Sequence, residues 1–116
     1  MEPGWTPLLA TPPFPEYVSA HSTFSAAAAT ALCLFFSDDN IAFSARTDAA
    51  GLYGVTRRFT SFSEAAEEAG MSRIYGGIHF RFSHLAGNAA GRRLGEYVFD
   101  NFFQSASGIA ATVTTR

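Results

Sequence analysis

The prolines of this 116-residue chain are confined to its first 15 residues, and this distribution constrains the fold more than any other feature. Proline fixes the backbone φ angle and lacks an N–H group, so residues 1–17 are predicted to be an extended lead-in rather than a helix. The rest of the chain contains no proline, and several stretches have apolar residues at helical spacing. The sequence therefore predicts an all-α helical bundle that follows an extended segment.

Three helices are expected within this bundle. The first is predicted by four apolar residues at positions i, i+4, i+7 and i+11, namely Phe24, Ala28, Ala31 and Phe35. Its N-cap is expected at Ser22 or Ser25, and its end at the turn residues 37–40. A short second helix is expected over 61–70, with Ser63 as the cap and Gly70 as the C-terminal stop.

The third helix is predicted over about 85–104, where Gly87, Gly91 and Gly95 form a smooth stripe suited to close helix contact. Residues 41–60 show little periodicity and are expected to form a long connection with a short hairpin. Residues 105–116 are small and polar and are expected to be a flexible tail. No internal boundary is evident, so residues 1–116 are taken as one domain, expected to be incomplete.

Composition restricts the class of protein. A net charge near -2 argues against nucleic-acid binding, which normally requires a basic surface. Charged residues make up only 16%, and the chain has 12 phenylalanines. Such a composition suits a piece of a larger helical protein, whose other part covers some of the aromatic rings.

Targeting signals are not expected in these residues. The first 15 residues have neither a basic start nor a long apolar run, so they do not form a signal peptide. The longest apolar stretch, 26–36, is too short to cross a bilayer. A soluble chain is expected, and its compartment stays open because Cys33 is the only cysteine and cannot form an internal disulfide.

Two segments carry groups that can hold a tetrahedral oxyanion. In the first, Ser19 offers a hydroxyl and Ala20 a backbone N–H, just before the first helix and its positive dipole end. In the second, Arg73 offers a planar fork that binds two oxygens at once. A histidine accompanies each segment, His21 in the first and His79 six residues after Arg73 in the second.

These segments resemble the second and third signature blocks of one superfamily. It joins the vanadium-dependent haloperoxidases to the type 2 phosphatidic acid phosphatases and the bacterial class A acid phosphatases. The residues that carry the resemblance are Glu16-Tyr17-Val18-Ser19-Ala20-His21-Ser22-Thr23-Phe24 and Ser72-Arg73-Ile74-Tyr75-Gly76-Gly77-Ile78-His79. The chain looks closest to the bacterial branch related to vanadium chloroperoxidases. The resemblance implies the C-terminal part of the vanadium haloperoxidase and acid phosphatase fold.

The resemblance also implies roles for individual residues. His79 corresponds to the vanadate ligand of the haloperoxidases, or to the nucleophile that forms a phosphohistidine in the phosphatases. His21 corresponds to the acid–base residue, and Ser19, Ala20 and Arg73 to oxyanion-binding groups. His84 is assigned to the start of the last helix and not to the site.

The chain departs from the family pattern at three places important for activity. Where the family usually has Pro-Ser-Gly-His, this chain has Val18-Ser19-Ala20-His21, and the methyl group of Ala20 costs about 1 kcal/mol if that position needs a positive φ. Ser83 occupies the position of an aspartate that supports the histidine, and a hydroxyl fixes an imidazole tautomer less well than a carboxylate does. The first signature block, a lysine followed by an arginine and a proline, has no match, and the chain contains no lysine. The in-chain substitutes would be arginines whose spacing does not recommend them: Arg46, Arg57, Arg58 and Arg92.

Three functions remain open at this point. The first is a vanadium-dependent haloperoxidase-like protein that binds vanadate as cofactor and uses hydrogen peroxide to oxidise halide. The second is a phosphomonoesterase on the same site, which needs no cofactor. The third is a non-catalytic remnant, or a subunit whose site is completed by a second chain that supplies the missing N-terminal half. A zinc site built from the three histidines lacks the usual close ligand spacing.

Overall fold

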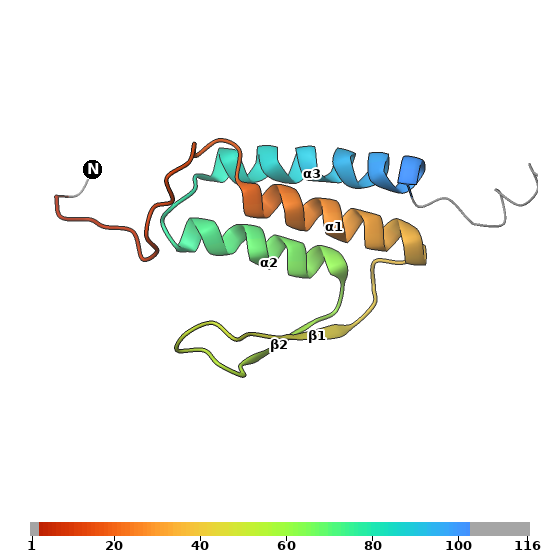
Figure 1. Ribbon diagram of the computed structural model, residues 1–116, viewed down its shortest axis with the longest axis horizontal. Coiled ribbons are helices and arrows are strands. Elements are labelled where there is room, and N and C mark those ends of the chain that lie inside the picture. Colours follow the sequence, from red (N-terminus) through yellow and green to blue (C-terminus); the bar gives the residue numbers. More distant parts are fainter. Residues whose placement is uncertain (1–2, 103–116) are drawn as a thin grey trace, which may run out of the picture.

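The computed structural model describes residues 3–102, which form three helices and one β-hairpin (Figure 1). In chain order these are α1 (Ala20–Phe36), β1 (Phe43–Arg46), β2 (Thr56–Phe59), α2 (Phe62–Tyr75) and α3 (Arg81–Phe102). The mostly helical bundle confirms the predicted fold class. The expected tail over 105–116 lies outside the described residues.

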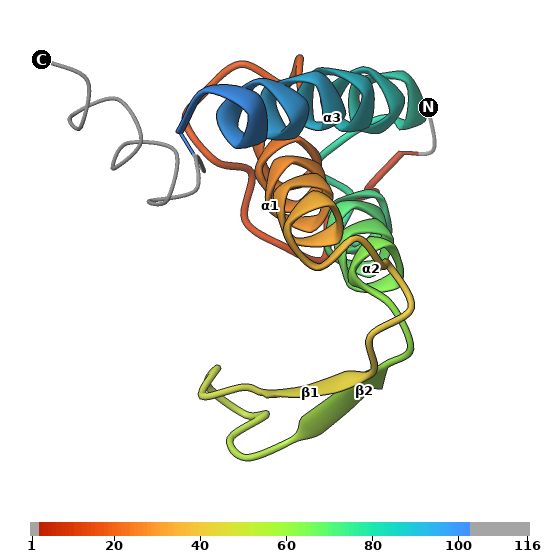
Figure 2. The ribbon, with the colours of Figure 1, turned by 90° about the vertical axis from the view of Figure 1, so that its right-hand side faces the viewer.

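The arrangement places α1 between the other two helices. Both ribbon views show α3 on one side of α1, and α2 on the other with the hairpin beyond it (Figures 1 and 2). The two strands pair antiparallel, with Phe43 opposite Phe59 and Arg46 opposite Thr56. This pairing confirms the short hairpin expected within residues 41–60.

The helix starts differ from those expected. Ser19 caps α1, because its hydroxyl accepts the N–H of Ser22, so the helix starts before either serine that was expected to cap it. Ser61, and not Ser63, caps α2 by accepting the N–H of Glu64. The third helix begins at Arg81, four residues before the expected start at Leu85. For α1 and α2, a serine upstream of the expected one provides the cap.

The prediction that Gly70 ends the second helix is wrong. The α2 helix continues to Tyr75, which places Ser72 and Arg73 in its last turn. Gly70 is buried where a methyl group would lie 2.6 Å from the His84 ring. This glycine therefore provides space for a side chain of α3, and the helix passes through it without stopping.

The glycine stripe of α3 brings that helix close to α1. A methyl group at Gly87 would lie 2.8 Å from the carbonyl oxygen of Ser19, and one at Gly95 would lie 2.6 Å from that of Ala27. Gly91 lies between them and faces the carbonyl of Thr23. Because real Cβ atoms do not approach backbone oxygens so closely, this contact requires glycine. The expectation that the stripe serves close helix packing is confirmed.

The hydrophobic core of residues 3–102 is small for the number of aromatic residues. Its buried apolar members are mainly alanines of α1 and α2 together with Phe59 and Ile78. Large rings stay exposed, including Phe24 at 71%, Tyr75 at 76% and Phe80 at 66%. None of the helices described is both long enough and apolar enough to cross a membrane.

The glycine stripe generates a testable prediction. Gly91→Leu should destabilise the fold by about 1–3 kcal/mol or more, because the side chain must displace the α1 backbone near Thr23. The matched control is Ala90→Leu, at the next position of α3 on an exposed face. Denaturant unfolding followed by circular dichroism measures both. Equal stability of the two variants would contradict the proposed close contact.

Candidate functional site

The predicted site residues come from three places in the fold. His21 lies in the first turn of α1, Arg73 in the last turn of α2, and His79 in the connection between α2 and α3. That connection turns back at Gly77, whose φ of 76° suits glycine. The N–H of Ile78 then bonds the carbonyl of Arg73 at 3.1 Å. The turn therefore returns the chain toward Arg73 just before His79.

The electrostatics of His21 place these three residues in one region. Partial desolvation lowers the pKa of His21, which is an exposed residue at the start of α1, and the charge of Arg73 and the nearby His79 lower it further. Charges act on a pKa in this way only over short distances. The structure therefore brings together the two histidines and the arginine that the sequence singled out, although they are up to 58 residues apart (79 minus 21).

His79 is buried and held by a carboxylate. Its exposure is 6%, and its Nδ1 lies 3.2 Å from Oε1 of Glu16. The same oxygen accepts the N–H of Phe80 at 2.9 Å. Burial acts to raise the pKa of Glu16, but the hydrogen bonds from Phe80, His79 and Ser83 outweigh it and the pKa is lowered. Glu16 is therefore a carboxylate that fixes the orientation of His79.

Sequence reasoning missed Glu16. It expected the supporting group at position 83, where a serine stands in place of the family's aspartate. The Ser83 hydroxyl instead donates to the backbone oxygen of Glu16 at 2.8 Å, so Ser83 supports the segment that carries the carboxylate. Glu16 is the first residue of the segment quoted for the family resemblance, but nothing in the sequence indicated a contact with a histidine 63 residues away.

Arg73 contains an unpaired donor. Its Nε is buried and has no hydrogen-bond partner among the described residues. Buried polar groups are normally satisfied, and an unpaired N–H of a guanidinium is costly to keep. An anion bound beside His21 and His79 would supply the missing acceptor. This orphaned donor is the observation in the structure that most directly indicates an anion-binding site.

The first turn of α1 contributes backbone donors. The N–H groups of Ser22 and Thr23 bond to Ser19, while those of Ala20 and His21 have no acceptor among residues 3–102. Free N–H groups at a helix start attract anions, and the helix dipole acts in the same direction. Ala20 has no positive φ, so its methyl group causes no backbone strain. The backbone role assigned to Ala20 thus fits the geometry.

Ser19 is placed differently from expectation. It has no exposed surface, and its hydroxyl accepts hydrogen bonds from the N–H and the hydroxyl of Ser22, at 3.4 Å and 2.9 Å. The side chain thus serves as the helix cap inside the protein. Direct contact of this hydroxyl with an anion stays a prediction.

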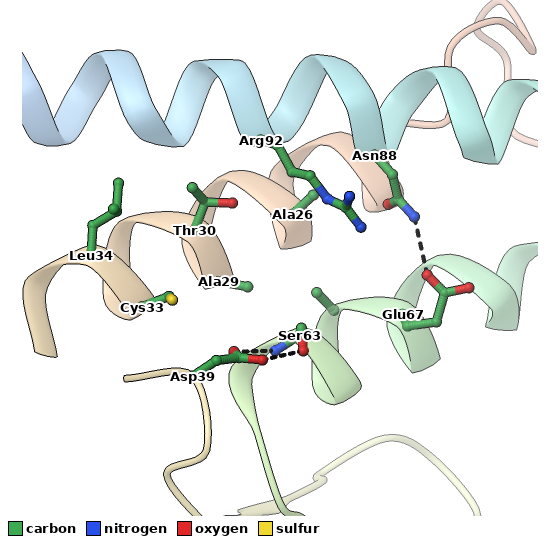
Figure 3. Close-up of a pocket in the computed structure, with 11 residues that line it drawn as sticks. Ala26, Ala29, Thr30, Cys33, Leu34, Asp39, Ser63, Glu67, Asn88 and Arg92 are labelled. Carbon is green, nitrogen blue, oxygen red and sulfur yellow. Dashed lines mark hydrogen bonds between the residues drawn. The ribbon is translucent and has the colours of Figure 1, made fainter. Parts of the chain in front are cut away.

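Two cavities adjoin these helices. A hollow of about 360 Å³ is lined by His79, Glu16, Trp5, Phe14 and other residues of the lead-in and the turn before α3. A groove of about 240 Å³ lies between the three helices, with an alanine-rich wall and the polar residues Glu67, Asn88 and Arg92 (Figure 3). None of the predicted site residues lines the groove, and His79 is the member of the set that lines the hollow.

The arginines considered as replacements for the missing first block lie elsewhere. Arg46, Arg57 and Arg58 are on the hairpin, and Arg57 pairs with Glu68 of α2 at the surface. Arg92 lines the groove of Figure 3. Among the described arginines of that set, none joins Arg73 at the site.

The fold is shared with proteins of known structure. A bacterial vanadium-dependent iodoperoxidase of known structure is 47% identical, with a TM-score of 0.76 over 83% of this chain and 23% of its own. Two structures of a bacterial vanadium-dependent chloroperoxidase, the holo and apo types, share the fold. They are 18% identical, with TM-scores of 0.71 and 0.70, over 84% and 83% of this chain and 23% of theirs. No curated protein matches.

The chain thus spans about a quarter of the length of the solved structures that it matches. Residues 1–108 match the family model described as the VCPO second helical-bundle domain. The chain therefore belongs to this family of helical-bundle domains, within the vanadium haloperoxidase and acid phosphatase superfamily.

Proposed function

We propose that this chain forms the histidine side of a vanadate site in a vanadium-dependent haloperoxidase. The observation that carries the proposal is the buried, unpaired Nε of Arg73 in the same electrostatic environment as His21 and His79. The donor set suits an oxyanion, since it combines a guanidinium, free helix N–H groups and a carboxylate-supported imidazole. Bound vanadate would supply the centre at which hydrogen peroxide is activated for halide oxidation.

His79 is the residue that would ligate vanadium. Its Nδ1 faces Glu16, so its Nε2 is the nitrogen left for a ligand bond. A carboxylate on Nδ1 favours the tautomer with the proton at that atom and raises the basicity of Nε2. The carboxylate–histidine arrangement therefore prepares a nitrogen donor, even though Ser83 has replaced the expected aspartate.

His21 has the properties of a proton acceptor. Its lowered pKa keeps the imidazole neutral at pH values where an ordinary histidine begins to carry charge. A neutral imidazole can take a proton from a peroxide molecule and return it to a leaving oxygen. The positive charge of Arg73 contributes to this role because it disfavours protonation of His21.

The rest of the site is assigned to polypeptide outside these 116 residues. A multiply charged anion requires more than one cation, and the hairpin arginines lie elsewhere. Exposed rings such as Phe24 and Tyr75 offer a face for further helices. The relatives of known structure are about four times longer than the matched part. The missing lysine and second arginine would come from that portion, in the same chain or in a second one.

Complementation tests the function. The chain alone should bind orthovanadate weakly. Fusion to the preceding part of the 47%-identical iodoperoxidase should produce iodide oxidation by hydrogen peroxide that is lost with His79→Ala. Arg73→Ala should cost about 2–4 kcal/mol of transition-state stabilisation, whereas the exposed control Arg93→Ala should be neutral.

Release of phosphate from a phosphomonoester, without halide oxidation, would instead favour a phosphatase. A folded fusion with neither activity would contradict both.

Glu16 provides a second prediction. Glu16→Gln in the fusion keeps the size of the side chain but removes the charge that supports His79, and should lower kcat about 10–100-fold. Ser83→Ala is the comparison variant, because it keeps the carboxylate and removes the hydroxyl that bonds the Glu16 backbone and helps to lower the pKa of Glu16, so a smaller loss is expected. A kcat for Glu16→Gln equal to that of Ser83→Ala would show that the carboxylate has no special role.

The pKa of His21 provides a third prediction, independent of activity. NMR titration of the imidazole should give a value below the ordinary 6.5, and Arg73→Met should raise it by removing a positive charge. The unfolded chain has the ordinary pKa, so it binds the proton at a higher pH than the folded chain does. The folded state therefore loses stability as the pH falls below 6.5. An unchanged pKa in Arg73→Met would show that the two side chains do not share a pocket.

A further inference from the structure

A network of hydrogen bonds connects the three helices beside the site, and it is buried at Ser19, Ser22 and His84 and reaches the surface at Glu67. It starts at the Ser19 hydroxyl, which accepts the hydroxyl of Ser22 at 2.9 Å. The Ser22 hydroxyl lies 2.9 Å from Nδ1 of His84, and Nε2 of His84 lies 3.1 Å from Oε1 of Glu67. Asn88 donates to the other oxygen of Glu67 at 3.1 Å. One side chain of α3, His84, thus connects α1 with α2.

Three polar members of this network are almost fully buried. Ser19 and Ser22 have no exposed surface, and His84 is 2% exposed. Burying such groups is costly, and the Oδ1 atom of Asn88 has no partner among the described residues, so apolar residues would pack there at lower cost. The network therefore indicates a role beyond filling space.

A second observation supports this role. Gly70 lies in the interior of α2, where glycine costs up to about 1 kcal/mol relative to alanine. A methyl group at this position would lie 2.6 Å from Nδ1 of His84 and 2.9 Å from the hydroxyl of Ser22. The α2 helix thus contains a destabilising residue at the one point that accommodates the contact between His84 and Ser22.

The order of the three groups resembles that of a serine nucleophile, a histidine base and a carboxylate. Ser22 has no exposed surface and lies within the packed first turn of α1, so no substrate reaches its hydroxyl. A hydrolytic site is therefore excluded here, and positioning of the helix start is the remaining role.

We infer that His84 is a positioning residue for the anion site, which it serves by holding the first turn of α1 through Ser22 and Ser19. This inference rests on the proposed function. Ser83, the residue before His84, also contacts both parts of the site. Its carbonyl oxygen accepts the N–H of Ser19 at 3.3 Å, and its hydroxyl donates to the backbone oxygen of Glu16. One turn of α3 thus fixes both the free N–H groups of α1 and the carboxylate behind His79.

The test uses the fusion described above, with orthovanadate as the probe and calorimetry as the measurement. His84→Leu should lower the affinity for orthovanadate about 10–100-fold, as loss of supporting hydrogen bonds does at metal sites. His84→Asn places an amide near the position of Nδ1 and should keep most of the affinity. His84→Gln places it near Nε2, keeps only the link to Glu67, and should resemble His84→Leu.

A control separates positioning from loss of stability. Ser61→Ala removes the buried cap of α2, at the opposite end of that helix from Arg73, and should lower the melting temperature without weakening orthovanadate binding. His84→Leu with wild-type affinity would overturn the inference. So would equal loss in Ser61→Ala, or equal affinity in the Asn and Gln variants.

A second readout needs no anion. Hydrogen exchange of the Ser22 and Thr23 amides, which bond to Ser19, should accelerate in His84→Leu and not in Ser61→Ala. If the wild-type fusion fails to bind orthovanadate, the proposed function is wrong. The hydrogen-exchange measurement would still decide whether His84 holds the first turn of α1. Unchanged exchange at these two amides would overturn the inference.

Discussion

The close contact between the glycine face of α3 and the backbone of α1 is the constraint on which the remaining structure depends. Gly87, Gly91 and Gly95 face carbonyl groups of α1, and a methyl group at any of these positions would overlap α1. Because the two backbones approach so closely, the start of α1 lies against the first turns of α3. Ser19 can then bond Ser83, and Ser22 can reach His84. The position of the first turn of α1 is thus set by helix packing.

Local patterns in the sequence were sufficient to predict the helices and the hairpin. Apolar spacing predicted α1, the loss of periodicity over 41–60 agreed with a hairpin, and the glycine stripe predicted close packing. Gly70 was misread because a glycine has the same appearance in sequence whether it ends a helix or makes room for a neighbour. Only the position of His84 across the interface distinguishes the two roles.

The candidate site was predictable to the extent that it lies in short motifs. His21, Arg73 and His79 were named from two segments, and the structure brings them into one electrostatic environment. Glu16 and His84 could not be found in this way, since their partners are 63 and 62 residues away in the sequence. Burial and long-range hydrogen bonding define their roles, and neither leaves a periodic signal.

The link between Glu16 and His79 also bears on the order of folding. Contacts between residues distant in sequence form late, because the chain must first lose the entropy of closing the intervening loop. This pair closes a loop that contains α1, the hairpin and α2, so it requires those elements to be docked. The contact between the lead-in and His79 is consequently expected to form after these elements have packed together. In a partly folded molecule the imidazole of His79 would lack the carboxylate that orients it.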